Sequence, residues 1–240
     1  MKKNYFLLLF FILIFASSFG QKNSSRVACL ETIYNQAMDY YSHYDYKEAI
    51  EQSMYLLEEA DKEDDVYFNY QANRILGFSY QDLNDTIRAR NHYEEALNYA
   101  LKLKNDTILV GAYINLGNVY SEDKKTTQKG IDYYKKVIAL TDKLGLKSDS
   151  FVPTLNIAWT YIDNNNFAKA GPYLKRARRI SDEYFPERED TQLEYLIGRY
   201  YMGIGDLDKA EIHLAKSINI AEEKSQILEA SHAYQEYSTL

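Results

Sequence analysis

Tyrosine recurs along this chain at an almost constant interval of 40 residues. The chain has 240 residues and 24 tyrosines, and five of these form an evenly spaced column: Tyr40, Tyr80, Tyr120, Tyr161 and Tyr201. Chance placement gives such a column with odds of roughly one in ten thousand, so the spacing indicates an internal repeat. A repeat of this length restricts the chain to architectures in which copies of one small unit stack on one another.

A small residue accompanies every column tyrosine. It stands three residues earlier in each copy, as Ala37, Gly77, Gly117, Ala158 and Gly198. Residues three apart share one face of a helix. The small residue therefore lets a neighbouring helix approach closely, while the tyrosine fills the adjacent space and can offer its hydroxyl to a partner. We name this predicted helix of each copy helix A.

A second column of small residues predicts a second helix, helix B. Its members are Ala49, Ala89, Gly130, Ala170 and Ala210. In most copies a large residue follows four positions later, as Tyr93, Tyr134, Leu174 and Leu214. Three positions further on stand Ala96, Val137, Ala177 and Ser217. This spacing is the apolar stripe of an amphipathic helix. No strand-type alternation is evident, so the chain is predicted to be all-α.

The turn between the two helices is also periodic. Asp45, Asp85, Asn166 and Asp206 hold the place just before helix B. Asp and Asn are preferred N-caps because their side chains accept otherwise unpaired backbone N–H groups. The third turn is one residue longer, with Thr126 or Thr127 as its expected cap. Gly145 and Pro186 mark the ends of two B helices.

The repeated unit resembles the tetratricopeptide repeat (TPR). The resemblance is carried by three segments: Leu76, Gly77, Tyr80, Ala89, Tyr93 and Ala96; Leu116, Gly117 and Tyr120; and Ile197, Gly198, Tyr201 and Ala210. The 40-residue period is similar to that of kinesin light chains and of the exported TPR regions of bacterial sensor and regulator proteins. The resemblance implies a TPR-type α-solenoid, a right-handed superhelix of antiparallel helix pairs. HEAT repeats share the period but lack the Gly/Ala-x-x-Tyr signature.

The chain departs from the family pattern in two ways. The tryptophan usual early in helix A is replaced by Ile33, Asn73, Tyr113, Thr154 and Glu194, and the proline that ends a repeat is mostly missing. The expected repeats are 28–67, 68–107, 108–148, 149–188 and 189–226, so that five repeats occupy 28–226. Residues 227–240 are expected to form the first helix of an incomplete sixth repeat, which suggests a truncated version of a longer protein.

The N-terminal residues 1–20 are predicted to be a secretory signal peptide. Lys2 and Lys3 precede an apolar run over residues 6–16, and Ser18 and Gly20 suit cleavage before Gln21. An uncleaved anchor is the alternative, whereas a lipoprotein is disfavoured because Cys29 lies well beyond the apolar run. The prediction places the mature protein outside the cytoplasm, in the periplasm or another extracytoplasmic space.

Charge and motif content argue against several other functions. Removing residues 1–20 leaves 26 basic and 35 acidic residues, a net charge of −9 that disfavours a nucleic-acid surface. The four histidines lie in separate repeats, and Asp163–Asn166 lacks the glycine and glutamate of a calcium loop. No catalytic motif or phosphate-binding glycine loop is present. We therefore expect no catalytic residue, no cofactor and no metal.

The remaining candidate is a groove for a peptide. In TPR superhelices the helix A residues not used in packing line a concave face, so the resemblance implies a groove on the A helices. An asparagine amide can both donate to and accept from a peptide bond, while aromatic residues and methionine provide apolar pockets. The alternative is that some of these side chains satisfy helix ends or belong to the core. The candidates are Tyr34, Asn35, Met38, Arg74, Phe78, Asn115, Asn118, Asn156, Trp159, Tyr195 and Arg199.

Two functions remain open from the sequence. The first is an exported TPR scaffold that binds a protein or an extended peptide in the groove. The second is the extracytoplasmic sensor region of a signal-transduction protein, either a histidine kinase or a LuxR-type transcriptional regulator. A transmembrane helix beyond Leu240 would favour the sensor, and no membrane span other than the N-terminal signal is expected in this segment.

Overall fold

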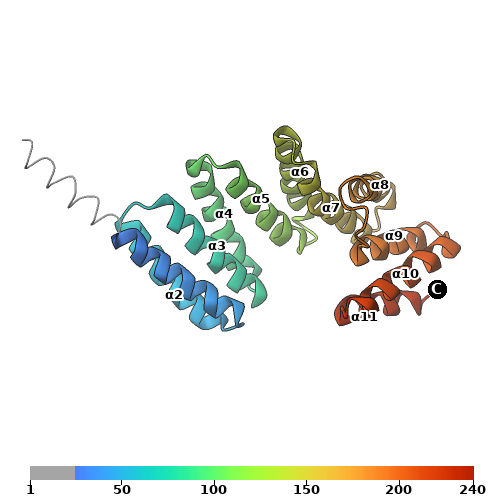
Figure 1. Cartoon of the computed structure of the whole chain (residues 1–240), viewed down its shortest axis with the longest axis horizontal. Coiled ribbons are helices and arrows are strands. Elements are labelled where there is room, and N and C mark those ends of the chain that lie inside the picture. Colours follow the sequence, from blue (N-terminus) through green and yellow to red (C-terminus); the bar gives the residue numbers. More distant parts are fainter. Residues whose placement is uncertain (1–24) are drawn as a thin grey trace, which may run out of the picture. The chain divides into compact units, whose positions relative to one another are not determined.

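All secondary structure that the computed structural model describes, over residues 25–240, is helical (Figure 1). The chain divides into two compact units, the first ending at Ala112 and the second beginning at Tyr113. The boundary falls within helix α5 (Asp106–Ser121). The predicted signal peptide lies outside the described residues. The all-α fold predicted from the repeat is confirmed.

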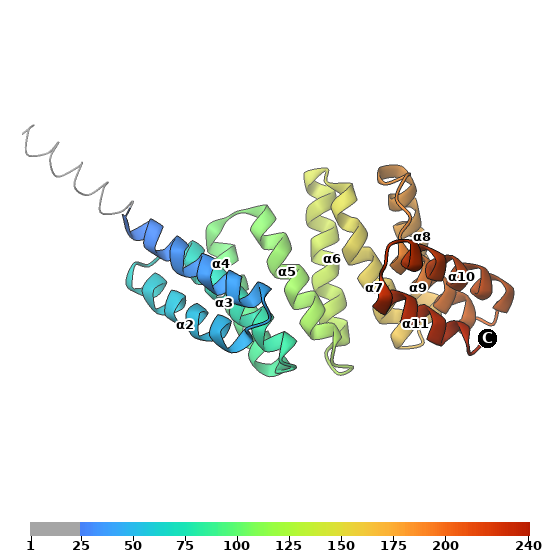
Figure 2. The same cartoon turned by 60° about the horizontal axis from the view of Figure 1, so that its bottom comes forward.

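The first unit consists of antiparallel helices joined by short turns. Residues 25–42 are helical, and they are followed by α2 (Tyr46–Lys62), α3 (Val66–Asp82), α4 (Thr86–Leu103) and the first part of α5. Helix α3 packs against both α2 and α4, and Figures 1 and 2 show these helices side by side. One core cluster contains Leu56 and Phe68, and a second contains Tyr70 and Ala96.

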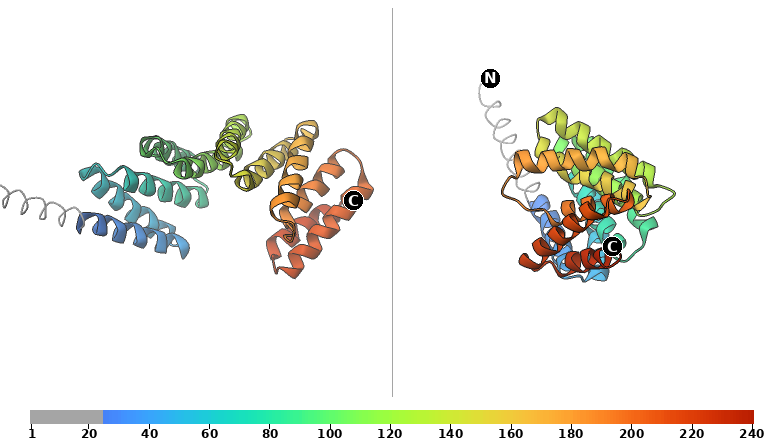
Figure 3. Two further views of the ribbon diagram at one scale, coloured as in Figure 1. Left: turned by 45° about the horizontal axis from the view of Figure 1, so that its top comes forward. Right: turned by 90° about the vertical axis from the view of Figure 1, so that its right-hand side faces the viewer.

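The second unit continues the same plan. After α5 come α6 (Thr127–Leu144), the short 3₁₀ helix η1 (Lys147–Ser150), α7 (Phe151–Asp163), α8 (Phe167–Tyr184), α9 (Thr191–Gly203), α10 (Leu207–Glu223) and α11 (Ile227–Tyr237). Helices α9, α10 and α11 lie side by side (Figure 3). One core cluster of this unit contains Leu155, Leu193 and Leu196, which are almost completely buried.

The two columns of small residues are the close contacts between helices A and B. A Cβ atom added to Gly77 would overlap the ring of Tyr93, and one added to Gly117 would overlap the ring of Tyr134. A Cβ on Gly198 would lie 2.7 Å from Cγ of Leu214. The large residue of helix B therefore rests directly on the small residue of helix A. This confirms the close approach predicted from the sequence.

The column tyrosines of four repeats each contact a cation and an aromatic ring, both from helix B. Tyr80 stacks on His92 with ring centroids 5.5 Å apart, and the guanidinium of Arg88 lies 4.5 Å from the Tyr80 centroid. The same arrangement holds Tyr120, whose ring is 5.8 Å from that of Tyr133 and 3.9 Å from the Lys129 ammonium. The equivalent partners are Lys169 and Tyr173 for Tyr161, and Lys209 and His213 for Tyr201.

The first repeat lacks both partners, and its column tyrosine is exposed. Glu48 and Gln52 stand where the other repeats carry the cation and the ring. Tyr40 is 39% exposed, whereas Tyr120 is 4% exposed. The column tyrosine of the first repeat is thus more exposed than that of the third, and its helix B offers neither a cation nor an aromatic ring at the equivalent positions.

The predicted helix caps are confirmed in three of the four positions. The side chains of Asp85, Asn166 and Asp206 each accept a hydrogen bond from the backbone N–H three residues later. Asp45 holds the cap position of α2 without such a bond. At the start of α6 the Thr126 hydroxyl instead donates to the carbonyl oxygens of Tyr120 and Asp123. Gly145 ends α6 in the left-handed conformation, with φ of 75°.

Candidate functional site

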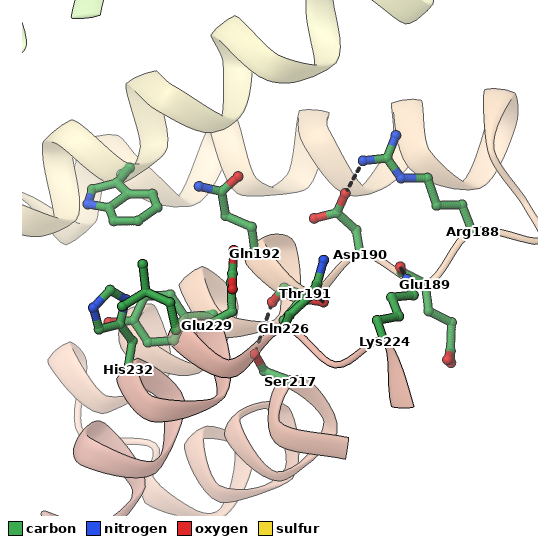
Figure 4. A pocket seen from close by; sticks show the side chains of 13 residues that line it. Arg188, Glu189, Asp190, Thr191, Gln192, Ser217, Lys224, Gln226, Glu229 and His232 are labelled. Atoms are coloured by element: carbon green, nitrogen blue, oxygen red, sulfur yellow. Dashed lines mark hydrogen bonds and ion pairs between the residues drawn. The ribbon is translucent and has the colours of Figure 1, made fainter. Parts of the chain in front are cut away.

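A pocket of about 400 Å³ lies within the second unit, among the A helices α7, α9 and α11. Its lining includes Trp159 from α7, Tyr195 from α9 and His232 from α11. The segment before α9 and the end of α10 complete it. Figure 4 shows Gln192 and Glu229 extending into the same space from α9 and α11. The pocket is thus built on the helices that the sequence assigned to ligand binding.

Hydrogen bonds between helices hold one wall of the pocket in place. The Thr191 hydroxyl donates to the Gln226 side-chain oxygen at 2.6 Å, and the Ser217 hydroxyl donates to the Thr191 carbonyl oxygen at 3.0 Å (Figure 4). The Lys224 ammonium donates to the carbonyl oxygen of Glu189. The start of α9 is therefore fixed to α10 and to the turn before α11.

The aromatic side of the pocket is braced by an ion-pair network. The rings of Trp159 and Tyr195 are 6.1 Å apart at 60°. Arg199 lies over the Tyr195 ring at 5.7 Å and pairs with Asp163 at 2.8 Å and with Glu236 at 3.0 Å. Burial raises the pKa of the Tyr195 phenol. Arg199 was a candidate for ligand contact, but its guanidinium is occupied by carboxylates of α7 and α11.

Some polar side chains that line the pocket make hydrogen bonds within the protein, and others do not. The Arg188 guanidinium donates to Asp190 at 2.8 Å (Figure 4), and Asp190 also caps α9 by accepting from the Leu193 N–H. Within the part of the chain that the structure describes, Gln192, Glu229 and His232 make no hydrogen bond or ion pair. Beside an aromatic wall, these free donors and acceptors can receive the polar groups of a ligand.

Two of the predicted asparagines bond to each other. The Asn118 side-chain oxygen accepts from the Tyr134 hydroxyl at 2.7 Å and from the Asn156 amide at 3.4 Å. Asn118 therefore fits the alternative considered from the sequence, in which some asparagines form hydrogen bonds within the protein and do not contact a ligand. Asn115 is half-buried, and no hydrogen bond of its side chain is found among the described residues. Asn115 and Asn156 remain candidates for ligand contact.

The candidates in the first unit fall into two places. Arg74, from α3, donates to the Tyr34 hydroxyl at 3.3 Å, and its guanidinium lies 5.6 Å from the Phe78 centroid. Met38 is half-buried. Asn35 instead lies in a shallow depression whose other lining residues are Thr32, Gln36, Asp39 and Tyr40. The structure thus brings Tyr34, Arg74 and Phe78 together and does not place Asn35 with them.

Sequence reasoning missed most of the pocket lining. The additional residues are Arg188, Glu189, Asp190, Thr191, Gln192, Ser217, Lys224, Gln226, Leu228, Glu229 and His232. One signal was present in the sequence. The connection between α8 and α9 runs over residues 185–190 and contains Pro186, and it is longer than the three-residue turns before α8, α10 and α11. This longer connection carries Arg188 and Asp190 to the pocket.

Residues 25–240 contain neither a metal-binding cluster of side chains nor a helix suited to span a membrane. No group of three or more histidine, cysteine, aspartate or glutamate side chains converges in a way that could hold a metal ion. No helix in that range combines the length and apolar character that crossing a bilayer requires.

Comparison with known proteins agrees with the architecture. The family model of the tetratricopeptide repeat matches residues 110–143 and 195–224. No curated protein matches the sequence significantly. Among solved structures, a putative kinesin light chain of Podosopora anserina with nearly identical TPR-like repeats has a TM-score of 0.66 at 16% identity, covering 81% of this chain and 96% of that one.

Two further solved structures are similar. A Rap protein complexed with Competence and Sporulation Factor has a TM-score of 0.62 at 16% identity over 89% of this chain, which spans 63% of that protein, less than two thirds. PilW, a type IV pilus biogenesis factor, has a TM-score of 0.61 at 18% identity, covering 88% of this chain and 91% of that one. At these identities the likeness shows the fold alone.

Stacked helix pairs with small-residue contacts define a helical solenoid. With the family-model matches in both the third and the fifth predicted repeat, the chain is a solenoid protein that carries tetratricopeptide repeats.

Proposed function

We propose that this protein is a binding scaffold that holds a protein or peptide segment in the pocket between α7, α9 and α11. The observation that carries the proposal is the combination of an aromatic wall, Trp159 and Tyr195, with the free polar side chains Gln192, Glu229 and His232. Aromatic anchors beside unpaired hydrogen-bonding groups are characteristic of peptide and protein recognition sites.

The chemistry of the lining suits a short extended segment. The Gln192 amide can donate to and accept from one peptide unit, as the groove asparagines were expected to do. The pocket volume of about 400 Å³ accommodates side chains of a peptide but not a folded domain. A Rap protein of similar fold has been solved in complex with Competence and Sporulation Factor, which supports binding of a second molecule by this fold.

A peptide selection tests this proposal. Peptides are selected from a random library on the full chain, and their affinities for variants are then measured by calorimetry. Trp159→Ala removes the aromatic anchor and should weaken binding by about 30-fold, since such an anchor contributes about 2 kcal/mol. Ile212→Ala is the matched control, because Ile212 is 64% exposed on α10 and does not line the pocket. Equal affinity for the wild type and Trp159→Ala would show that the peptide binds elsewhere.

We further propose that the protein acts outside the cytoplasm. The support is the basic and apolar character of residues 1–20, which is typical of a secretory signal. The intact mass of protein recovered from the cell envelope is expected to correspond to a chain that begins at Gln21. A chain that still begins at Met1 would contradict cleavage.

A further inference from the structure

Helix α9 carries a buried carboxylate that does not line the pocket just described. Glu194 is 2% exposed. At 100° per residue it points about 200° away from Gln192 and about 100° away from Tyr195, and it does not line the pocket. One carboxylate oxygen accepts from Arg178 of α8 at 2.7 Å and from Lys216 of α10 at 2.9 Å, and the other is 2.7 Å from Nδ1 of His213.

A second cavity adjoins this cluster. It measures about 290 Å³ and is lined by α8, α9 and α10. Three of its lining residues can donate hydrogen bonds and carry or acquire positive charge: Lys175, Arg178 and His213. Tyr200 and Tyr201 add hydroxyl groups, and Leu174 and Ile197 add apolar surface.

The charges around the cavity do not balance. The Lys175 ammonium makes no ion pair or hydrogen bond in the described part of the chain. Arg178 and Lys216 share the single carboxylate of Glu194. The cavity is thus lined by two permanent cations, Lys175 and Arg178, of which only Arg178 is paired with a carboxylate, in a protein whose formal net charge is −7.

Glu194 also fixes the orientation of two cavity residues. Glu194 accepts from one guanidinium nitrogen of Arg178 and contacts Nδ1 of His213. The remaining N–H groups of Arg178 and the Nε2 atom of His213 are not bound by Glu194. A buried carboxylate that orients donors in this way reduces the entropy that they lose on binding a ligand.

We propose that this cavity binds an oxyanion, either a carboxylate or a phosphate group, through Lys175, Arg178 and His213. Charge-assisted hydrogen bonds from arginine and lysine are the strongest that a protein offers to these groups. The oxyanion is either a small free ion or an acidic side chain of a partner protein. The site uses other residues of α9 and does not depend on the peptide pocket.

Titration of the full chain with inorganic phosphate, at constant ionic strength and followed by NMR, tests the proposal. A second titration uses a glutamate-containing peptide and its glutamine counterpart. Lys175→Gln should weaken oxyanion binding about tenfold or more, which is the loss expected for one charge-assisted hydrogen bond. Lys216→Gln is the matched control, because Lys216 binds Glu194 but does not line the cavity.

The outcomes separate the sources of the oxyanion. Binding of phosphate that is weakened by Lys175→Gln but not by Lys216→Gln supports a free ion. If only the glutamate peptide binds, and Lys175→Gln weakens that binding while Lys216→Gln does not, the oxyanion is an acidic side chain of a partner protein. Failure of both probes to bind, or equal loss in the two lysine variants, would overturn the proposal.

Discussion

At the scale of single residues, the column tyrosines combine two roles. In four repeats the ring contacts both a cation and an aromatic ring from helix B. The cation stands immediately before the second small column, as Arg88, Lys129, Lys169 and Lys209. Cation–aromatic contacts of this kind contribute more when they are partly desolvated. The arrangement explains why an unusual number of tyrosines is compatible with a folded core.

Truncation of column tyrosines should therefore have unequal effects. Tyr120→Ala removes a ring that is 4% exposed, and should lower the free energy of unfolding by about 3–5 kcal/mol. Tyr40→Ala removes a ring that is 39% exposed and lacks both partners, so its effect should be much smaller. Urea denaturation followed by circular dichroism compares the two. Equal losses would show that the covering cation and ring contribute little.

Two glycines of α5 provide a second comparison. Gly117→Ala places a methyl group against the Tyr134 ring and should cost about 1–3 kcal/mol, as overpacking does. Gly111→Ala places it 3.6 Å from the Tyr70 hydroxyl, an ordinary contact, and should stabilise the helix by about 0.5–1 kcal/mol. Thermal melts of both variants measure the difference. Stabilisation by both substitutions would contradict the close contact at Gly117.

The Glu194 cluster makes stability depend on pH. Burial raises the pKa of the Glu194 carboxyl, but hydrogen bonds from His213, Lys216 and Arg178 outweigh this and hold the pKa below its ordinary value. The stabilisation is therefore fully present above the unfolded-state pKa and is lost as the pH falls through the folded-state pKa.

Glu194→Gln tests this dependence. At pH 7 the variant should be less stable than the wild type by about 1–3 kcal/mol, because the partly exposed cationic donors lose their charged acceptor. The difference should shrink as the pH falls below the range in which carboxyls ordinarily titrate. Glu229→Gln, an exposed side chain without a partner among the described residues, should show no difference at either pH. If the difference in stability between the wild type and Glu194→Gln did not change with pH, the role assigned to the Glu194 charge would be contradicted.

At the scale of helices, the sequence predicts packing better than it predicts the site. The small-residue columns and the caps at Asp85, Asn166 and Asp206 could be predicted because each depends on residues within one helix pair. The pairing of Asn118 with Tyr134 could not, because an amide has several partners within reach and only the packed geometry selects one.

The pocket itself was predicted only in part. Trp159 and Tyr195 follow from the position of helix A residues in the repeat. The remaining wall depends on the connection over residues 185–190 and on where α10 ends, and neither has a periodic signal. A cation stands directly before the second small column in four repeats, whereas the first repeat has Glu48 there. This difference in the sequence could have indicated that Tyr40 is more exposed.

At the scale of the whole molecule, the repeat assigns different tasks to the two helices of each pair. In the second unit the A helices α7, α9 and α11 surround the pocket, whereas α8 and α10 supply the cations around Glu194. Helix α9 contributes to both sites through different residues. The central claim is that partner binding uses the A-helix side of this unit.

Hydrogen exchange of the full chain, with and without a peptide selected on it, tests that claim most directly. We expect the peptide to slow exchange in α7, in the first turns of α9 and in α11, and Trp159→Ala to reduce this protection at the same peptide concentration. Protection confined to α8 and α10, or protection that persists unchanged in Trp159→Ala, would contradict it.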